Sequence, residues 1–154
     1  MDDIDRKIAE LIQGDGQLSS AEVGKAVGVS TSTANERIRK LTATGVVKAW
    51  RAILDPNRVG ARLCALIFVD IDYGGEEAFR RAVAQMPEVQ EAHHVTGAHS
   101  YLLKVRVADT EALQAFLENK IKPLGGITRT ESLVVLRTLK ETSQVLLIRK
   151  DEEA

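Results

Sequence analysis

The residues best suited to bind a charged partner lie in one short basic block. Residues 37–62 carry seven Arg and Lys side chains against a single acid, Asp55, whereas residues 1–36 have a net charge of −4 and residues 63–154 one of −3. A charge run is often only a solvated surface. A basic block between two acidic segments, however, has the charge distribution that neutralises phosphate groups, and it favours a nucleic acid as the partner.

Capping signals predict three helices before and within this block, over residues 2–15, 19–27 and 30–44. Each begins at a side chain that caps helix N-termini: Asp2, Ser19 and Ser30. Glu22 completes a capping box with Ser19, and Gly28 allows a tight turn before the third helix. A helix, a short helix, a turn with glycine and a longer helix are the pattern of a helix-turn-helix, which can be winged-helix-like.

The third predicted helix has one apolar and one polar face. A helical wheel directs Ala34, Ile38 and Leu41 toward a core, so the opposite face is free to meet a partner. An ordinary amphipathic surface helix would show the same division. Combined with the basic block, short polar and basic side chains favour contact with base edges and phosphates. We expect the DNA-contacting residues to be Ser32, Thr33, Asn35, Glu36, Arg37, Arg39, Lys40, Lys48 and Arg51.

The remaining residues predict an α+β domain with the order βαββαβ. Alternating or continuous apolar runs indicate strands over residues 63–72, 89–95, 101–107 and 127–139, and helical stripes lie between the first and second and between the third and fourth strands. This order is typical of the ferredoxin-like split unit, in which both helices cover one face of an antiparallel sheet. The strands are apolar on both faces, so we expect a second subunit against the uncovered face. Residues 144–150 are compatible with an added strand, and residues 151–154 are expected to be loose.

The composition argues against several other classes of protein. Five of the first seven residues are charged, and the 154-residue chain has no apolar run of membrane-spanning length, so neither a signal peptide nor a membrane location is expected. The single cysteine, Cys64, fits a reducing, cytoplasmic environment.

Three histidines are the only candidates for metal or catalytic chemistry. His93 and His94 are neighbours on a predicted strand and point to opposite faces, so they cannot readily bind one ion together, and no carboxylate or cysteine sits at metal-ligand spacing to complete a set with them and His99. The sequence offers no defensible group of nucleophile, base and orienting residue. We therefore expect no catalytic residue, metal or cofactor.

The chain resembles the leucine-responsive/asparagine-regulator (Lrp/AsnC) family of transcriptional regulators along nearly its whole length. The motifs that carry the resemblance are Asp5-Arg6-Lys7-Ile8, Gly28-Val29-Ser30, Arg37-Ile38-Arg39-Lys40-Leu41, Gly45-Val46-Val47, the aromatic Trp50, and Leu54-Asp55-Pro56-Asn57-Arg58-Val59-Gly60. The resemblance implies a helix-turn-helix domain over residues 1–45, a connector over 46–62 and a dimerising, effector-sensing domain over 63–154. It also implies partly palindromic operators, a homodimer and further assembly to a tetramer or octamer.

The resemblance further implies a pocket for a small-molecule effector, expected to be an amino acid. The segment Thr96 to Tyr101 is similar to the family's Thr/Ser-Gly-x-x-x-Tyr-Leu-Leu loop, although family members usually carry acids where this chain has Ala98 and Ser100. A plain β-hairpin turn remains the alternative. The implied effector residues are Thr96, Gly97, Ala98, His99, Ser100, Tyr101, Thr130 and Ser132.

Two other functions remain open at this point. A sirohaem decarboxylase group of the same fold uses histidines around a tetrapyrrole, but an enzyme has no need of the basic block. An architectural DNA-binding protein without a specific operator would use the same basic block.

Overall fold

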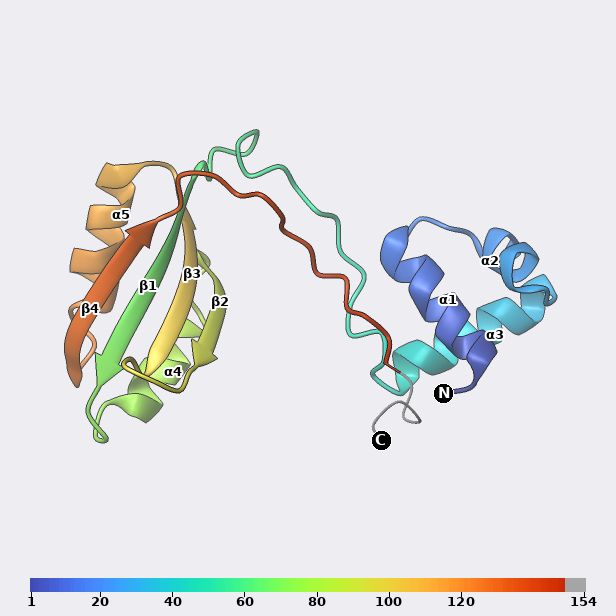
Figure 1. The fold of residues 1–154 in the computed structure, drawn as a ribbon, viewed down its shortest axis with the longest axis horizontal. Coiled ribbons are helices and arrows are strands. Elements are labelled where there is room, and N and C mark those ends of the chain that lie inside the picture. Colours follow the sequence, from blue (N-terminus) through green and yellow to red (C-terminus); the bar gives the residue numbers. More distant parts are fainter. Residues whose placement is uncertain (149–154) are drawn as a thin grey trace. The chain divides into compact units, whose positions relative to one another are not determined.

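The computed structural model describes residues 1–148, which divide into two units (Figure 1). The first unit contains residues 1–53 together with residues 140–148, and the second contains residues 54–139. This division differs from the predicted domains, 1–45 and 63–154 joined by a 46–62 connector, because the C-terminal segment lies with the N-terminal helices. The predicted loose end, residues 151–154, lies outside the described residues.

The first unit consists of the three predicted helices: α1 (Asp3–Gly14), α2 (Ser20–Val27) and α3 (Thr31–Ala43). All three predicted caps are confirmed. Asp2 Oδ1 accepts from the Asp5 amide at 2.7 Å, Ser19 and Glu22 form a complete capping box, and Ser30 Oγ accepts from the Thr33 amide at 3.1 Å. These bonds satisfy amides that would otherwise have no partner in the first turn of each helix.

A small aliphatic core holds these helices together, and a glycine lets two of them come close. The buried core comprises Ile8, Ala9, Ile12, Val23, Ala34 and Leu41. Gly24 on α2 lies so near the turn into α3 that a Cβ there would stand 2.8 Å from the Val29 carbonyl oxygen. A larger residue at position 24 would push α2 away from the start of α3.

The second unit is the predicted βαββαβ domain, with strand order β2-β3-β1-β4 in one antiparallel sheet. Its elements are β1 (Leu63–Ile71), α4 (Glu76–Val83), β2 (Val89–His94), β3 (Tyr101–Val107), α5 (Thr110–Phe116) with a π-helical turn over Leu117–Ile121, and β4 (Ile127–Val134). Side chains from both helices, including Phe79 and Phe116, share one core with Ile67 and Leu103 of the sheet. The α+β class and the element order are therefore confirmed.

The sheet has a second face, opposite the one on which α4 and α5 pack their core residues. Alternation along β1 directs Leu66, Phe68 and Asp70 to this open face, while Ile67 and Val69 face the helices. Leu102 and Leu133 are aligned with Phe68 and Leu66 and share the open face.

The last strand is shorter than predicted, because its partner ends. β4 stops at Val134, opposite Ala65, and one further bond joins the Val135 amide to the Cys64 carbonyl. β1 begins at Leu63, so residues 136–139 have no neighbouring strand and are exposed. The predicted strand end at Leu139 was wrong for this reason.

Residues 140–148 bind to α1 and do not add a strand to the sheet. Gln13 makes two side-chain bonds to the Val145 backbone, donating to its carbonyl at 3.0 Å and accepting from its amide at 3.1 Å. The Arg6 guanidinium donates to the Ile148 carbonyl at 3.0 Å, and Leu147 packs on the helix-turn-helix core. Polar side chains of α1 thus hold the backbone of residues 145–148, and this segment packs Leu147 against the helix-turn-helix core.

Among the described residues, no helix has both the length and the apolar character needed to cross a membrane.

The docked segment leads to a stability prediction. Leu147→Asp places a carboxylate against the core of the first unit, and we expect it to lower the free energy of unfolding of that unit by about 1–3 kcal/mol. Leu146→Asp is the matched control, because Leu146 is 87% exposed on the same segment. Urea unfolding followed by circular dichroism measures both variants. Equal midpoints for the two variants would show that the segment adds no stability.

Candidate nucleic-acid interface and effector loop

The polar face of α3 is open to solvent. Ala34 and Leu41 are buried in the core, and the opposite side exposes Ser32, Asn35, Glu36, Arg39 and Lys40. Within residues 1–148, no ion pair engages Arg39 or Lys40. The helix therefore presents two cations and several short polar side chains to an approaching partner.

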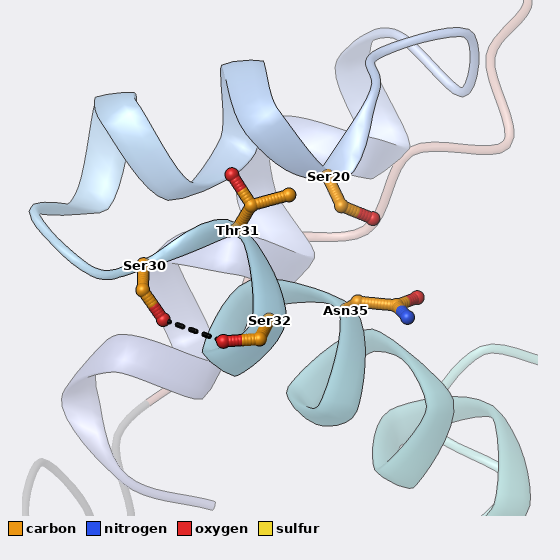
Figure 2. A pocket seen from close by; sticks show the side chains of 5 residues that line it. All are labelled: Ser20, Ser30, Thr31, Ser32 and Asn35. Atoms are coloured by element: carbon orange, nitrogen blue, oxygen red, sulfur yellow. Dashed lines mark hydrogen bonds between the residues drawn. The ribbon is translucent and has the colours of Figure 1, made fainter.

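A shallow groove lies where α2 and α3 begin, lined by Ser20, Ser30, Thr31, Ser32 and Asn35 (Figure 2). Ser30 Oγ is 2.9 Å from Ser32 Oγ and 2.8 Å from Thr33 Oγ1, so the cap of α3 also orients these hydroxyls. Hydroxyls beside two helix N-termini suit a phosphate oxygen. The sequence did not lead us to predict Ser20, Ser30 and Thr31 as contact residues. Their position at the N-termini of α2 and α3 could have indicated this role.

Arg37 points away from the other residues of α3 that were predicted to contact DNA. Its guanidinium is 2.6 Å from Asp2 Oδ2 and 2.6 Å from Asp5 Oδ1, both on or beside α1. These bonds, that to Asp2 first, raise the pKa of Arg37, while the Asp5 amide and then Arg37 lower the pKa of the Asp2 carboxyl. The structure thus places Arg37 between two helices, where it joins α3 to α1.

The two predicted cations beyond α3 follow directly from the end of the helix. The Val47 amide donates to the Leu41 carbonyl at 3.0 Å, and the Val47 side chain packs on the helix-turn-helix core. Lys48 and Arg51 come immediately after this anchored residue, and both are exposed.

The loop between β2 and β3 holds the other group of predicted residues. The Val95 amide donates to the Ser100 carbonyl at 3.0 Å, and Gly97 has a φ of 113°, a conformation that favours glycine. Thr96, Gly97 and Ala98 are exposed at the tip, while Tyr101 begins β3 and is buried against Phe79.

His99 is held on the open face of the sheet by groups that sequence reasoning did not identify. Its ring stacks on Phe68 with centroids 4.7 Å apart, and its Nδ1 is 3.3 Å from Asp70 Oδ1. Glu131 Oε2 lies 3.9 Å from His99 Nε2, and the Asp70 carboxylate also accepts from the Ser100 amide at 3.1 Å. The alternation of β1 indicated that Asp70 shares a face with Phe68, but only the strand pairing brings the loop to it.

Thr130 and Ser132 do not join His99. Thr130 is aligned with Val69 and Ser132 with Ile67, so both hydroxyls lie on the helix-covered side of the edge strand β4. Glu131, aligned with Phe68, lies on the open side. One subunit therefore separates the predicted effector residues onto the two faces of its sheet.

The remaining chemistry candidates stand apart from one another. His93 lies 3.3 Å from Glu91, His94 stacks on Tyr101, and Cys64 is buried. In the part of the chain that the structure describes, no three His, Cys, Asp or Glu side chains are placed to hold a metal ion.

A helix-turn-helix with an exposed polar recognition face, joined to a ferredoxin-like domain, defines a two-domain DNA-binding regulator. Family models agree with both halves: an AsnC-type helix-turn-helix domain matches residues 1–42, and an Lrp/AsnC ligand binding domain matches residues 64–145. The chain belongs to the Lrp/AsnC family of transcriptional regulators. The family indicated by the sequence motifs is confirmed.

Individual relatives match over nearly the full length. The HTH-type transcriptional regulator FL11 of Pyrococcus horikoshii is 36% identical, covering 94% of this chain and 95% of the relative. The leucine-responsive regulatory protein of Escherichia coli K12 is 33% identical over 96% and 92% of the two chains. Both are named as regulators, which favours regulation over the sirohaem decarboxylase alternative.

Solved structures give the same result. A transcriptional regulator from Neisseria meningitidis, crystallised as an L-Met complex, has a TM-score of 0.91 and 30% identity, covering 95% of this chain and 96% of that one. Escherichia coli AsnC has a TM-score of 0.82 and 30% identity, with 94% and 97% covered.

Proposed function

We propose that this regulator binds partly palindromic operators of amino-acid-related genes in the cytoplasm, and that an amino acid modulates its binding. The observation that carries the DNA-binding part is the exposed polar face of α3, where Arg39 stands without an ion-pair partner among the described residues. A recognition helix of this kind enters the major groove, and its side chains reach base edges and phosphates.

The proposed contact set differs slightly from the predicted one. Arg37 is excluded because Asp2 and Asp5 hold it against α1, and Thr33 because it is half-buried and bonded to Ser30. The hydroxyls at the groove between α2 and α3 are added as phosphate contacts. The proposed set is Ser20, Ser30, Thr31, Ser32, Asn35, Glu36, Arg39, Lys40, Lys48 and Arg51.

The open face of the sheet supports assembly into a homodimer, with a tetramer or octamer as the further step. Leu66, Phe68 and Leu102 are only half-buried in the single chain, and Leu133 is 47% exposed beside them. A second sheet against this face would remove these side chains from water. A two-fold dimer would present two copies of α3, which matches a partly palindromic operator.

An amino acid is the proposed effector, and its pocket needs a second subunit. The similar regulator from Neisseria meningitidis was solved with L-Met, and the matched model is a ligand binding domain. Because Thr130 and Ser132 lie on the opposite face from His99, loop and hydroxyls meet around one ligand only if they come from different copies of the chain. Ala98 and Ser100 leave the ligand's ammonium group without a loop carboxylate.

The DNA-binding proposal predicts a specific loss for Arg39→Ala. If the guanidinium binds a guanine edge, its removal should weaken operator binding by about 1–3 kcal/mol and relax the preference at one base pair. Lys48→Ala should instead weaken all sequences alike and lower the salt dependence by about one counterion. Fluorescence anisotropy of labelled duplexes over a salt series measures both effects.

The control for these variants is Arg81→Ala, since Arg81 is an exposed cation on α4 of the other unit. It should change neither affinity nor salt dependence. If Arg39→Ala behaved like Arg81→Ala, the polar face of α3 would not be the DNA interface.

The effector proposal predicts that Ser100→Asp tightens the binding of neutral amino acids. The new carboxylate would supply the charge that family members usually carry in this loop, and a gain of about twofold to fivefold is expected for a partly exposed ion pair. Calorimetry with L-Met and L-Leu tests this, with the exposed Ser143→Asp as the charge-matched control. Binding unchanged by Ser100→Asp would place the effector site away from this loop.

A further inference from the structure

Glu36 is the one acidic side chain on α3, and it lies in the middle of the proposed DNA-binding face. It is exposed and lines a shallow groove together with Arg39, Lys40 and Ala43. A carboxylate is unexpected at this point, because every other charged side chain on the exposed side of the helix is a cation.

The Glu36 carboxylate does not form ion pairs with the neighbouring cations of α3. Arg39 and Lys40 stand three and four residues further along the helix, the spacings at which ion pairs commonly form. In residues 1–148, nevertheless, no ion pair joins either cation to Glu36. Arg37 shows the contrast, since both of its carboxylate partners come from the region of α1.

A carboxylate on a DNA-facing helix has an electrostatic cost that a base contact can offset. Duplex DNA carries one negative charge per about 1.7 Å of its axis, so phosphates repel an unpaired carboxylate. A carboxylate can only accept hydrogen bonds. In the major groove the donors are cytosine N4 and adenine N6, and adenine also presents its N7 acceptor beside the donor, so cytosine is the better match.

We propose that Glu36 is a specificity-determining residue that selects cytosine at one position of each half-site and rejects guanine and thymine there. The inference rests on the proposed DNA-binding function. Guanine and thymine offer O6, N7 or O4 acceptors, which repel the carboxylate. Arg39 lies about 4.5 Å further along the helix axis, close to the step of about 3.4 Å between base pairs. Glu36 and Arg39 therefore read neighbouring base pairs.

The test is selection of bound duplexes from a random library by the full-length protein at one fixed salt concentration. The wild type should enrich a motif with cytosine at one position of each half-site. Glu36→Ala should keep the rest of the motif and lose most of a discrimination of about 5- to 150-fold at that position. Glu36→Gln should move the preference toward adenine, because an amide both donates and accepts.

Glu10→Ala is the control, since Glu10 is an exposed acid on α1 and its removal changes the net charge equally. If Glu36→Ala selects the unchanged wild-type motif and, like Glu10→Ala, only binds all sequences more tightly, Glu36 is a mere repulsive charge and the proposal is wrong. The proposal is also overturned if the wild type enriches a motif in which no cytosine position changes when Glu36 is replaced. Failure of the wild type to enrich any motif would instead overturn operator binding itself.

Discussion

The buried carboxylate of Asp5 is the constraint on which the DNA-binding unit depends. Asp5 is 4% exposed and is the only buried charged residue in the described core, so it requires a partner that compensates for its desolvation. Arg37 reaches it from α3 and also binds Asp2, the cap of α1. This double contact fixes the rotation of α3, and with it the outward direction of Ser32, Asn35, Glu36 and Arg39.

The same unit also depends on the other end of the chain. β4, which carries Thr130 and Ser132, continues into the segment that Gln13 and Arg6 hold against α1. The chain therefore runs between the two units twice: before β1 it is continuous with the three helices, and after β4 it leads to a segment held on α1 by hydrogen bonds and packing. In the proposed regulator, an effector-linked change in β4 can be transmitted along the chain to α1. Arg37 connects α1 to the recognition helix α3.

Local signals in the sequence predicted most of the elements, because each depended on nearby residues. The caps at Asp2, Ser19 and Ser30 and the alternation in β1 need no distant partner. Features set by distant pairing were missed. The end of β4 depends on where β1 begins, and the role of Arg37 depends on the residues of α1 that meet it. The His99 cluster likewise needs the pairing that brings Asp70 and Glu131 together.

In the proposed regulator, the exposed face of α3 reads the major groove at two symmetric half-sites. Methylation interference on a selected operator distinguishes the two grooves, because dimethyl sulfate methylates guanine N7 in the major groove and adenine N3 in the minor groove. If α3 enters the major groove, guanine N7 methylation should block binding in two clusters, separated by about 10 base pairs or a multiple of that spacing. Interference confined to adenine N3, or absent from both grooves, would contradict it.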